Sequence, residues 1–277
     1  MPMFLVNDEG FQGHPGENTR AAALMWEALR VQAMTVVLQR PGLGCLVGEP
    51  VLECSGLGPG MATRIAHLLV PHDARERGSM LAMLLELSTQ RDLEDCMAAD
   101  LEAVVQRDPA FQNELEVFLF AKGYAALQAY RFAHLLLRQG RRMEALYLQA
   151  RCNVVLGIDI NPACRIGRGV LLDHGTGIVI GETAVVEDHV SILQGVTLGG
   201  TGKDSGDRHP KVRTGVMIGA GAKILGNIEI GAGSKVGANS VVVKAVPPRT
   251  TVVGVPAAGV GQPRHERPAQ EMDQSVS

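Results

Sequence analysis

The stretch VRTGVMIGAGAKILGNIEIGAGSKVGANSVV, residues 212–242, has an aliphatic residue at every sixth position. Neither the 3.6-residue period of a helix nor the two-residue period of a strand explains this spacing. A hexad is typical of a parallel β-helix, whose short strands stack aliphatic side chains inward and whose glycines turn the corners. A glycine-rich β-sandwich would not hold one phase so long. The six positions are Val212, Ile218, Ile224, Ile230, Val236 and Val242.

The same period extends upstream, and a break separates the two runs. The sixteen residues from Val196 to Val212 are not a multiple of six, so we predict that residues 199–211 form a loop extruded from the coil. This loop is polar and ends in a cationic segment, and loops on a rigid scaffold commonly carry functional sites. The upstream positions are Ile160, Ile166, Leu172, Ile178, Ala184, Val190 and Val196.

Residues from about 17 to 150 repeat their apolar positions at helical spacing instead, as in Met80, Leu84 and Leu87. We predict an all-α domain over residues 1–154, a β-helix domain over 155–262 and a flexible tail over 263–277. Asp108-Pro109 has the form of a helix start, and Gly140 suits the end of that helix. The Gly/Pro-rich interval from 41 to 60 predicts a loop or short irregular helix.

Composition excludes several classes of protein. The 277 residues are 46% hydrophobic with a net charge of −3, which gives no basic field for nucleic acid or anionic lipid. Five cysteines without a C-x-x-C pair argue against a disulfide framework and a zinc knuckle. The opening run 1–6 is too short for a signal sequence, and no stretch approaches the ~20 apolar residues of a membrane helix. We expect a cytoplasmic protein with reduced thiols and no bound metal.

His174 is the candidate catalytic base. It lies two positions past an inward position, so its ring should point away from the coil interior, within the polar stretch Asp173-His174-Gly175-Thr176. Asp159 precedes it by fifteen residues, close to the eighteen of one three-hexad coil, so the two can lie on adjacent coils as base and orienting carboxylate. A hydrogen bond that stabilises a corner turn is the alternative role of Asp159.

Several longer motifs resemble serine acetyltransferases over roughly residues 90–260. The pair of Asp-His-x-Thr-Gly and Gly-Asp-Arg-His-Pro is far more specific than any single hexad. Asn161 and Gly175 depart from the family, which usually has histidine and alanine there. The motifs are Gly123-Tyr124-Ala125-Ala126-Leu127-Gln128-Ala129-Tyr130-Arg131, Asp159-Ile160-Asn161-Pro162, Asp173-His174-Gly175-Thr176-Gly177, Ile180-Gly181-Glu182-Thr183, Val196-Thr197-Leu198-Gly199-Gly200-Thr201-Gly202-Lys203 and Gly206-Asp207-Arg208-His209-Pro210-Lys211.

The resemblance implies a left-handed parallel β-helix and acetyl transfer from acetyl-CoA to L-serine in cysteine biosynthesis, with His174 as general base. It places Arg208 and His209 at the serine carboxylate and Asp108 and Asp173 at its ammonium, which suits a zwitterion. From the residues alone, Asp108 can also cap a helix, Asp173 can bond a turn, and Arg208 can solvate the loop.

The resemblance also implies where acetyl-CoA and the partners bind. The pantetheine arm would bond backbone groups at Gly200 and Ala220, Ala238 would line the groove, and Lys235 would lie near the phosphates. L-Cysteine would occupy the serine site as a feedback inhibitor. Family members are dimers of trimers with active sites between neighbouring coils. The end of the chain, 274–277, lacks the isoleucine that relatives insert into O-acetylserine sulfhydrylase, which argues against docking of that enzyme.

Three alternatives remain from the sequence. A β-helix acetyltransferase for a sugar would not need the charges at Arg208 and Asp173. A γ-type carbonic anhydrase would need three histidines on one zinc, for which His174, His189 and His209 can be counted. A catalytically silent scaffold for the sulfhydrylase is the third.

Overall fold

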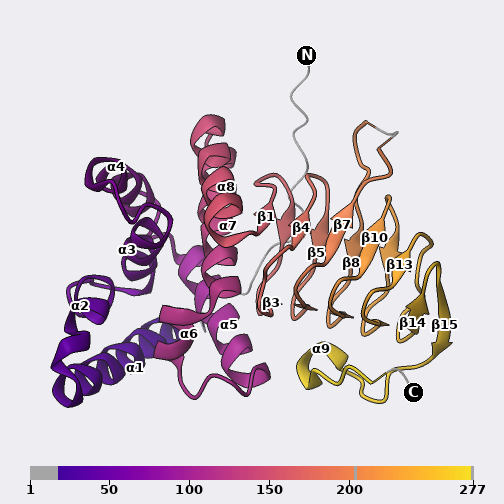
Figure 1. Cartoon of the computed structure of the whole chain (residues 1–277), viewed down its shortest axis with the longest axis horizontal. Coiled ribbons are helices and arrows are strands. Elements are labelled where there is room, and N and C mark those ends of the chain that lie inside the picture. Colours follow the sequence, from indigo (N-terminus) through magenta and orange to yellow (C-terminus); the bar gives the residue numbers. More distant parts are fainter. Residues whose placement is uncertain (1–17, 203–204, 276–277) are drawn as a thin grey trace.

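The computed structural model describes residues 18–202 and 205–275, so the expectations on residues 1–6 and on the last two residues lie outside the described part. A helical half is followed by a β-helix, which confirms the predicted fold class (Figure 1). The helices are α1 (Asn18–Gln39), η1 (Pro41–Leu43), α2 (Gly44–Val47), η2 (Gly48–Leu52), α3 (Leu57–Leu69), α4 (Ala74–Leu85), α5 (Arg91–Arg107), α6 (Glu114–Phe120), α7 (Lys122–Arg138) and α8 (Arg142–Leu156).

Local chemistry sets several helix ends. Asn113 accepts a hydrogen bond from the N–H of Glu116 and starts α6. Gly140, at φ 79°, follows the end of α7, as its sequence position predicted. The prediction that a helix starts at Asp108 is wrong, because Asp108 follows the last residue of α5 and its side chain accepts from the N–H of Ala110 in a loop.

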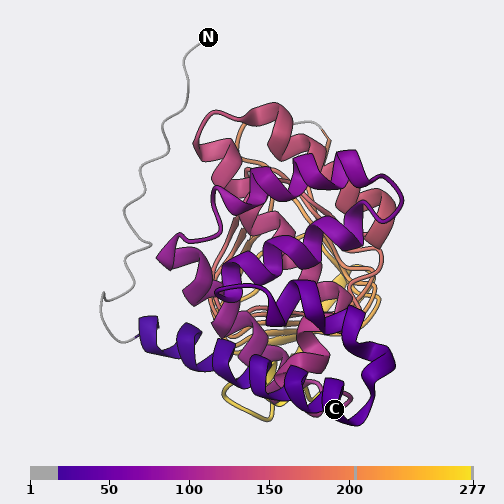
Figure 2. The ribbon, with the colours of Figure 1, turned by 90° about the vertical axis from the view of Figure 1, so that its left-hand side faces the viewer.

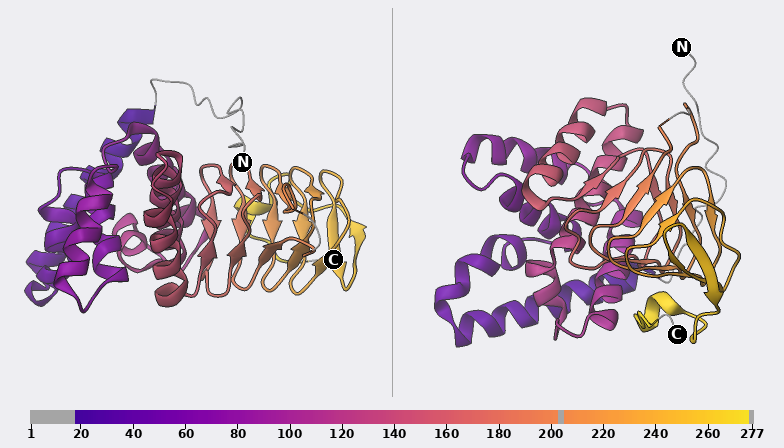
Figure 3. Two further views of the ribbon diagram at one scale, coloured as in Figure 1. Left: turned by 90° about the horizontal axis from the view of Figure 1, so that it is seen from above. Right: turned by 45° about the vertical axis from the view of Figure 1, so that its right-hand side comes forward.

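Short parallel strands form three sheets around an aliphatic core, and the coils stack along one axis (Figure 3). We name the sheets by their strands. Sheet A contains β1 (Asp159–Ile160), β4 (Val179–Ile180), β7 (Thr197–Gly199), β10 (Lys223–Leu225) and β13 (Val241–Val242). Sheet B contains β2 (Arg165–Ile166), β5 (Val185–Val186), β8 (Lys211–Val212) and β11 (Glu229–Ile230). Sheet C contains β3 (Leu171–Leu172), β6 (Ser191–Ile192), β9 (Met217–Ile218), β12 (Lys235–Val236), β14 (Thr251–Gly254) and β15 (Ala257–Gly261).

The strand register corrects one part of the sequence prediction. Asp159 pairs with Val179, so the first coil takes twenty residues, whereas Val179 pairs with Thr197, eighteen residues on. Two extra residues therefore lie between β3 and β4, in the turn that contains His174. As a result the strand positions after that turn are Ile180, Val186, Ile192 and Leu198, and the predicted set Ile178, Ala184, Val190 and Val196 occupies the buried corner positions instead.

The first coil has no coil before it, and the helical half covers this open end (Figure 2), with α5 and α7 against β3 and α8 against β1. The hydroxyl of Tyr130 donates to the carbonyl of Cys164 at 2.7 Å, and Arg131 donates to the carbonyl of Gly167 at 2.6 Å. Asp100, fully buried, pairs with Arg131 at 2.7 Å and accepts from the N–H of Val170 at 3.0 Å. These bonds satisfy backbone groups that a free sheet edge would leave unpaired.

The far end of the coil is closed differently. Strand β15 pairs antiparallel with β14, at the last edge of sheet C. Helix α9 (Pro268–Glu271) then returns beside the coil (Figure 1), where Ala269 packs against Leu193 and Met217 in a small apolar cluster. The C-terminal segment therefore covers part of sheet C.

One composition-based expectation fails at α1. Residues 21–39 are long and apolar enough to cross a membrane by length and composition, although we predicted that no stretch would approach that limit. Only 22% of this apolar segment is buried. One such helix is weak evidence for a membrane span, because core helices of soluble proteins reach the same length and apolar character.

Candidate active site

The turn between β3 and β4 holds His174 in an unusual backbone conformation. The N–H of Gly175 donates to the carbonyl of Asp173 at 2.6 Å, and the N–H of Thr176 donates to the carbonyl of His174 at 3.0 Å. His174 has φ 54° and Gly175 has φ 74°, so two tight turns follow each other in the left-handed region. A non-glycine residue held there costs about 1–3 kcal/mol and is common at active sites. The side chain of His174 is 73% exposed, pointing out of the coil.

A cavity of about 210 Å³ lies beside this turn, between the coil and the helical half. Asp108, Asp173 and His174 line it together with apolar side chains such as Phe111 and Phe120. The distance from His174 Nε2 to Asp173 Oδ1 is 3.8 Å. Burial raises the pKa of the Asp173 carboxyl, His174 lowers it in part, and the negative charge of Asp108 raises it further. The cavity is therefore acidic and suits a small cationic group.

Asp159 lies on β1, whose neighbour β4 begins just after the His174 turn. Its Oδ1 accepts a hydrogen bond from Gln149 Nε2 of α8 at 2.7 Å. Within the described ranges 18–202 and 205–275, no hydrogen bond or ion pair joins Asp159 to His174. The role of Asp159 as the orienting carboxylate stays a prediction.

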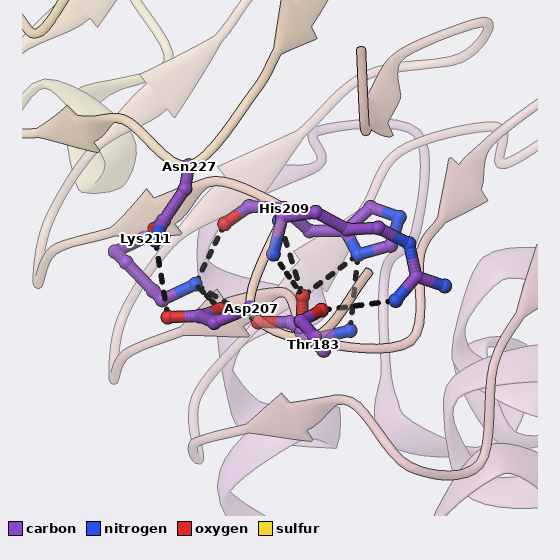
Figure 4. A network of polar contacts seen from close by, with 7 residues as sticks. Thr183, Asp207, His209, Lys211 and Asn227 are labelled. Carbon is purple, nitrogen blue, oxygen red and sulfur yellow. Dashed lines mark hydrogen bonds and ion pairs between the residues drawn. The ribbon is translucent and has the colours of Figure 1, made fainter. Parts of the chain in front are cut away.

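Arg208 and His209 belong to the loop before β8 and lie against the turn that follows β4. His174, in contrast, lies in the turn that precedes β4. Figure 4 shows their network, in which the Nδ1 atom of His209 accepts from the N–H of Thr183 at 3.1 Å and contacts Thr183 Oγ1 at 2.8 Å. Because a backbone N–H can only donate, Nδ1 is an acceptor and the proton of the neutral ring is on Nε2. Burial lowers the pKa of His209, and the charge of Arg208 lowers it further. The ring covers Gly181, where a Cβ would come within 2.1 Å of it.

Other contacts hold the cationic loop in place. Arg208 Nη2 lies 2.7 Å from Glu182 Oε2, and Lys211 Nζ lies 2.6 Å from Asp207 Oδ1 (Figure 4). Asn227 of the next coil donates to Asp207 at 3.2 Å. Glu182 and Thr183, which belong to a motif quoted for the resemblance, had no predicted role.

The structure thus brings the site residues predicted from the sequence together in two groups. Asp108, Asp173 and His174 meet at the corner before β4, while Arg208 and His209 lie at the corner after it. Within one chain, the two groups therefore lie at opposite ends of strand β4 of sheet A.

The residues predicted to bind acetyl-CoA have varied surroundings. Gly200 lies against Arg208, where a Cβ would be 3.4 Å from the Cγ atom. Ala220 and Ala238 stack at one corner, since the carbonyl of Ala220 accepts from Asn239 at 2.8 Å. Lys235 is only 4% exposed, and its Nζ donates to the carbonyl of Ser275 in the C-terminal segment.

Metal ligation finds no support in the part of the chain that the structure describes. No group of three or more His, Cys, Asp or Glu side chains there could hold a metal ion. His174, His189 and His209 lie in three different turns of the coil. A single chain therefore does not assemble, from its described residues, the zinc site that a carbonic anhydrase would need.

Comparisons with known proteins identify the family. The family model described as "Serine acetyltransferase, N-terminal" matches residues 25–129, and "Bacterial transferase hexapeptide (six repeats)" matches 209–244. The serine acetyltransferase of Escherichia coli K12 is 47% identical over 251 residues, covering 91% of this chain and 92% of that protein. The match at residue 25 corrects the expectation that the resemblance begins near residue 90.

Solved structures agree with the sequence comparisons. The crystal structure of serine acetyltransferase from Vibrio cholerae O1 has a TM-score of 0.88 at 47% identity, covering 92% of this chain and 99% of its own. A serine acetyltransferase in complex with cysteine has a TM-score of 0.88 at 45% identity, covering 92% of this chain and all of its own. With the helical half, the hexapeptide coil and the acidic cavity at His174 all in place, the chain belongs to the serine acetyltransferase family.

Proposed function

We propose that this chain transfers the acetyl group of acetyl-CoA to the hydroxyl of L-serine, giving O-acetylserine and coenzyme A. The observation that carries the proposal is the cavity in which Asp108, Asp173 and His174 meet. Two carboxylates suit the ammonium of an amino acid, and an exposed imidazole beside them suits its hydroxyl. Relatives have been solved with serine and with coenzyme A, which supports both substrates.

His174 acts as the general base in this mechanism. Its ring takes the proton of the serine hydroxyl as the oxygen attacks the thioester carbon. The tetrahedral intermediate collapses with cleavage of the C–S bond, and the imidazolium returns its proton to the departing sulfur. General-base catalysis of this type contributes typically ~10²–10⁴-fold. Asp159 would orient the ring, for which its carboxylate would have to exchange its bond to Gln149 for one to His174.

A direct transfer needs no acyl-enzyme, and the thiols are consistent with that. Cys164 is fully buried, and burial raises its pKa to about 12. Burial raises the pKa of Cys152 to about 12 as well. Neither thiol has the lowered pKa of a nucleophilic cysteine at neutral pH.

We propose that Arg208 and His209 from the coil of a neighbouring chain recognise the carboxylate of serine. Within one chain these residues lie at the other end of strand β4 from His174, so a second copy beside the first would complete the site. We infer the dimer of trimers expected of the family. The apolar, exposed side chains Leu24, Val31 and Leu38 on α1 support contact between helical halves.

The remaining assignments follow from the same site. L-Cysteine would bind in the same site as a feedback inhibitor. A relative has been solved in complex with cysteine, which supports this assignment. Gly200, Ala220, Ala238 and Lys235 would contact acetyl-CoA, for which Lys235 would have to leave the C-terminal segment. We place the protein in the cytoplasm. Docking of O-acetylserine sulfhydrylase is not proposed.

The test is thiol release from acetyl-CoA with L-serine, compared with a sugar acceptor. We expect His174→Asn to lower kcat by at least ~100-fold, because it removes the base. His189→Asn is the matched control, since His189 also lies in a corner turn with positive φ, at 59°. Asparagine tolerates that conformation, so both variants should fold. A variant at His174 that keeps full activity would reject the assignment, and turnover with the sugar alone would favour the sugar acetyltransferase.

A further inference from the structure

Helix α7 begins directly against the turn that carries His174. A Cβ on Gly123 would lie 1.8 Å from the carbonyl oxygen of Leu172, so only glycine permits this approach. On the other side of the turn, a Cβ on Gly175 would lie 2.5 Å from Ile158 Cδ1 and 3.3 Å from the Cα of Gly123. The left-handed turn is therefore held between the first residues of α7 and the start of the coil.

Lys122, the first residue of α7, adds a polar contact to this packing. Its Nζ donates a hydrogen bond to Thr176 Oγ1, fifty-four residues away in the sequence. The N–H of Thr176 in turn donates to the carbonyl of His174. Lys122 also lines the cavity that contains Asp108 and His174. This lysine thus links the helical half to the catalytic turn.

The position of this lysine is unfavourable for the helix itself. The N-terminus of a helix carries a partial positive charge, so a cation in the first turn is unfavourable. No acidic residue stands in the first turn of α7 to offset it. Selection for helix stability alone would not retain a lysine there. The contact that the structure gives its ammonium is the hydrogen bond to the hydroxyl of Thr176, at the rim of the cavity that Asp108 and Asp173 also line.

We propose that Lys122 is a positioning residue for the acetyl transfer, fixing the His174 turn through Thr176. This inference rests on the proposed function of His174. A strained turn relaxes when a restraint is removed, and a displacement of the ring by about 1 Å can cost ~10²-fold in rate. Lys122 does not touch the reacting atoms in this proposal, so removing its ammonium lowers kcat and leaves the KM for acetyl-CoA unchanged.

The experiment compares Lys122→Met with Lys122→Arg, and Thr176→Val with Thr176→Ser, in the full chain. We expect Lys122→Met and Thr176→Val each to lower kcat by about 10–100-fold. The arginine and serine variants keep the donor and the acceptor and should recover most of the rate. The double variant should be no slower than either single one, because both remove the same bond. Lys244→Met, at an exposed lysine of the coil, is the control.

Two further measurements separate this role from a purely structural one. The melting temperature of Lys122→Met should change little, because the loss of the hydrogen bond to Thr176 is offset by the loss of an unfavourable charge at the helix N-terminus. Hydrogen exchange of backbone amides in residues 171–180 should become faster in this variant and stay unchanged elsewhere. This exchange does not depend on turnover, so it tests the restraint even if serine proves not to be the acceptor. Unchanged exchange, unchanged kcat, or a parallel loss of melting temperature and rate would each overturn the proposal.

Discussion

Asp173 is a residue at which folding and the proposed binding of serine make opposite demands. Its carboxyl is 15% exposed and shares a cavity with Asp108 and His174. Burial and the neighbouring carboxylate raise its pKa, so its charged form is less stable in the folded protein than in the unfolded chain. The proposed contact with the ammonium of serine needs that charged form. A functional site that costs stability in this way is common among enzymes.

Replacing this charge should separate the two effects. We expect Asp173→Asn to raise the melting temperature at pH 7 and to lower kcat/KM for serine by about 10–100-fold, the worth of a charge-assisted hydrogen bond. The raised pKa of Asp173 also predicts how the gain in stability depends on pH. The penalty exists where Asp173 is ionised, so the gain in stability should disappear as the pH falls through its folded-state pKa.

Thermal melts over a pH series and initial rates with L-serine check these outcomes. Asp108→Asn should change stability in the same direction, because the two carboxylates repel each other. A lower melting temperature for Asp173→Asn at pH 7 would contradict the proposed conflict between stability and binding.

The sequence predicted where individual side chains lie on the coil better than it predicted their contacts. The hexad placed His174 outside the coil, where it is, and the cationic loop ends at the predicted Arg208 and His209. The bond from Lys122 to Thr176 could not be predicted, because it joins two domains and depends on the extra residues in the first coil. The Gln149 contact of Asp159 likewise comes from α8, whose orientation the sequence does not specify.

At the scale of elements, α7 determines how the coil begins. One face of this helix bonds the carbonyls of the first coil through Tyr130 and Arg131, and Gly123 brings its start against Leu172. The two-residue insertion that shifted the hexad phase lies at the same place. The period of six predicted the coil correctly, yet a step of eight residues instead of six leaves aliphatic residues at both phases, so composition could not reveal it.

Glycine to alanine substitutions give a test at this scale. Gly123→Ala should destabilise the fold by about 1–3 kcal/mol, because its Cβ would overlap backbone atoms of Leu172 rather than a movable side chain. In an open helix the same change is favourable by about 1 kcal/mol. Gly78 of α4, where an added Cβ would meet nothing within 4 Å, is the matched control and should gain stability.

Chemical denaturation of both variants checks the difference in sign. An equal gain at Gly78 and Gly123 would show that α7 does not press on the His174 turn. A loss at both would point to an effect on helices in general.

At the scale of the whole molecule, the residues of the proposed site lie in two groups. His174 and the two aspartates lie on the side of the turn before β4, and Arg208 lies against the turn after β4. The exposed apolar side chains of α1 lie far along the chain from both, in the helical half. We therefore expect that contacts between coils affect activity, whereas contacts between helical halves affect the number of chains in the assembly.

A charge placed among the exposed apolar side chains of α1 tests that separation. We expect Leu38→Asp, at a side chain 77% exposed, to convert a hexamer into trimers while kcat per chain changes little, because the proposed site lies between coils. Light scattering measures the mass, and Leu85→Asp on α4 is the control. An unchanged mass would remove α1 from the proposed interface.

The place of the His174 turn in the first coil has a consequence for how such a protein could change its length. Helices α5 and α7 cover the end of the coil next to that turn, and their side chains bond its backbone, so a coil added there would displace the helical half. At the other end, β13 is the last strand of sheet A and β15 is the last strand of sheet C. Coils inserted beyond β12 would therefore leave the His174 turn unaltered while moving the C-terminal segment away from it.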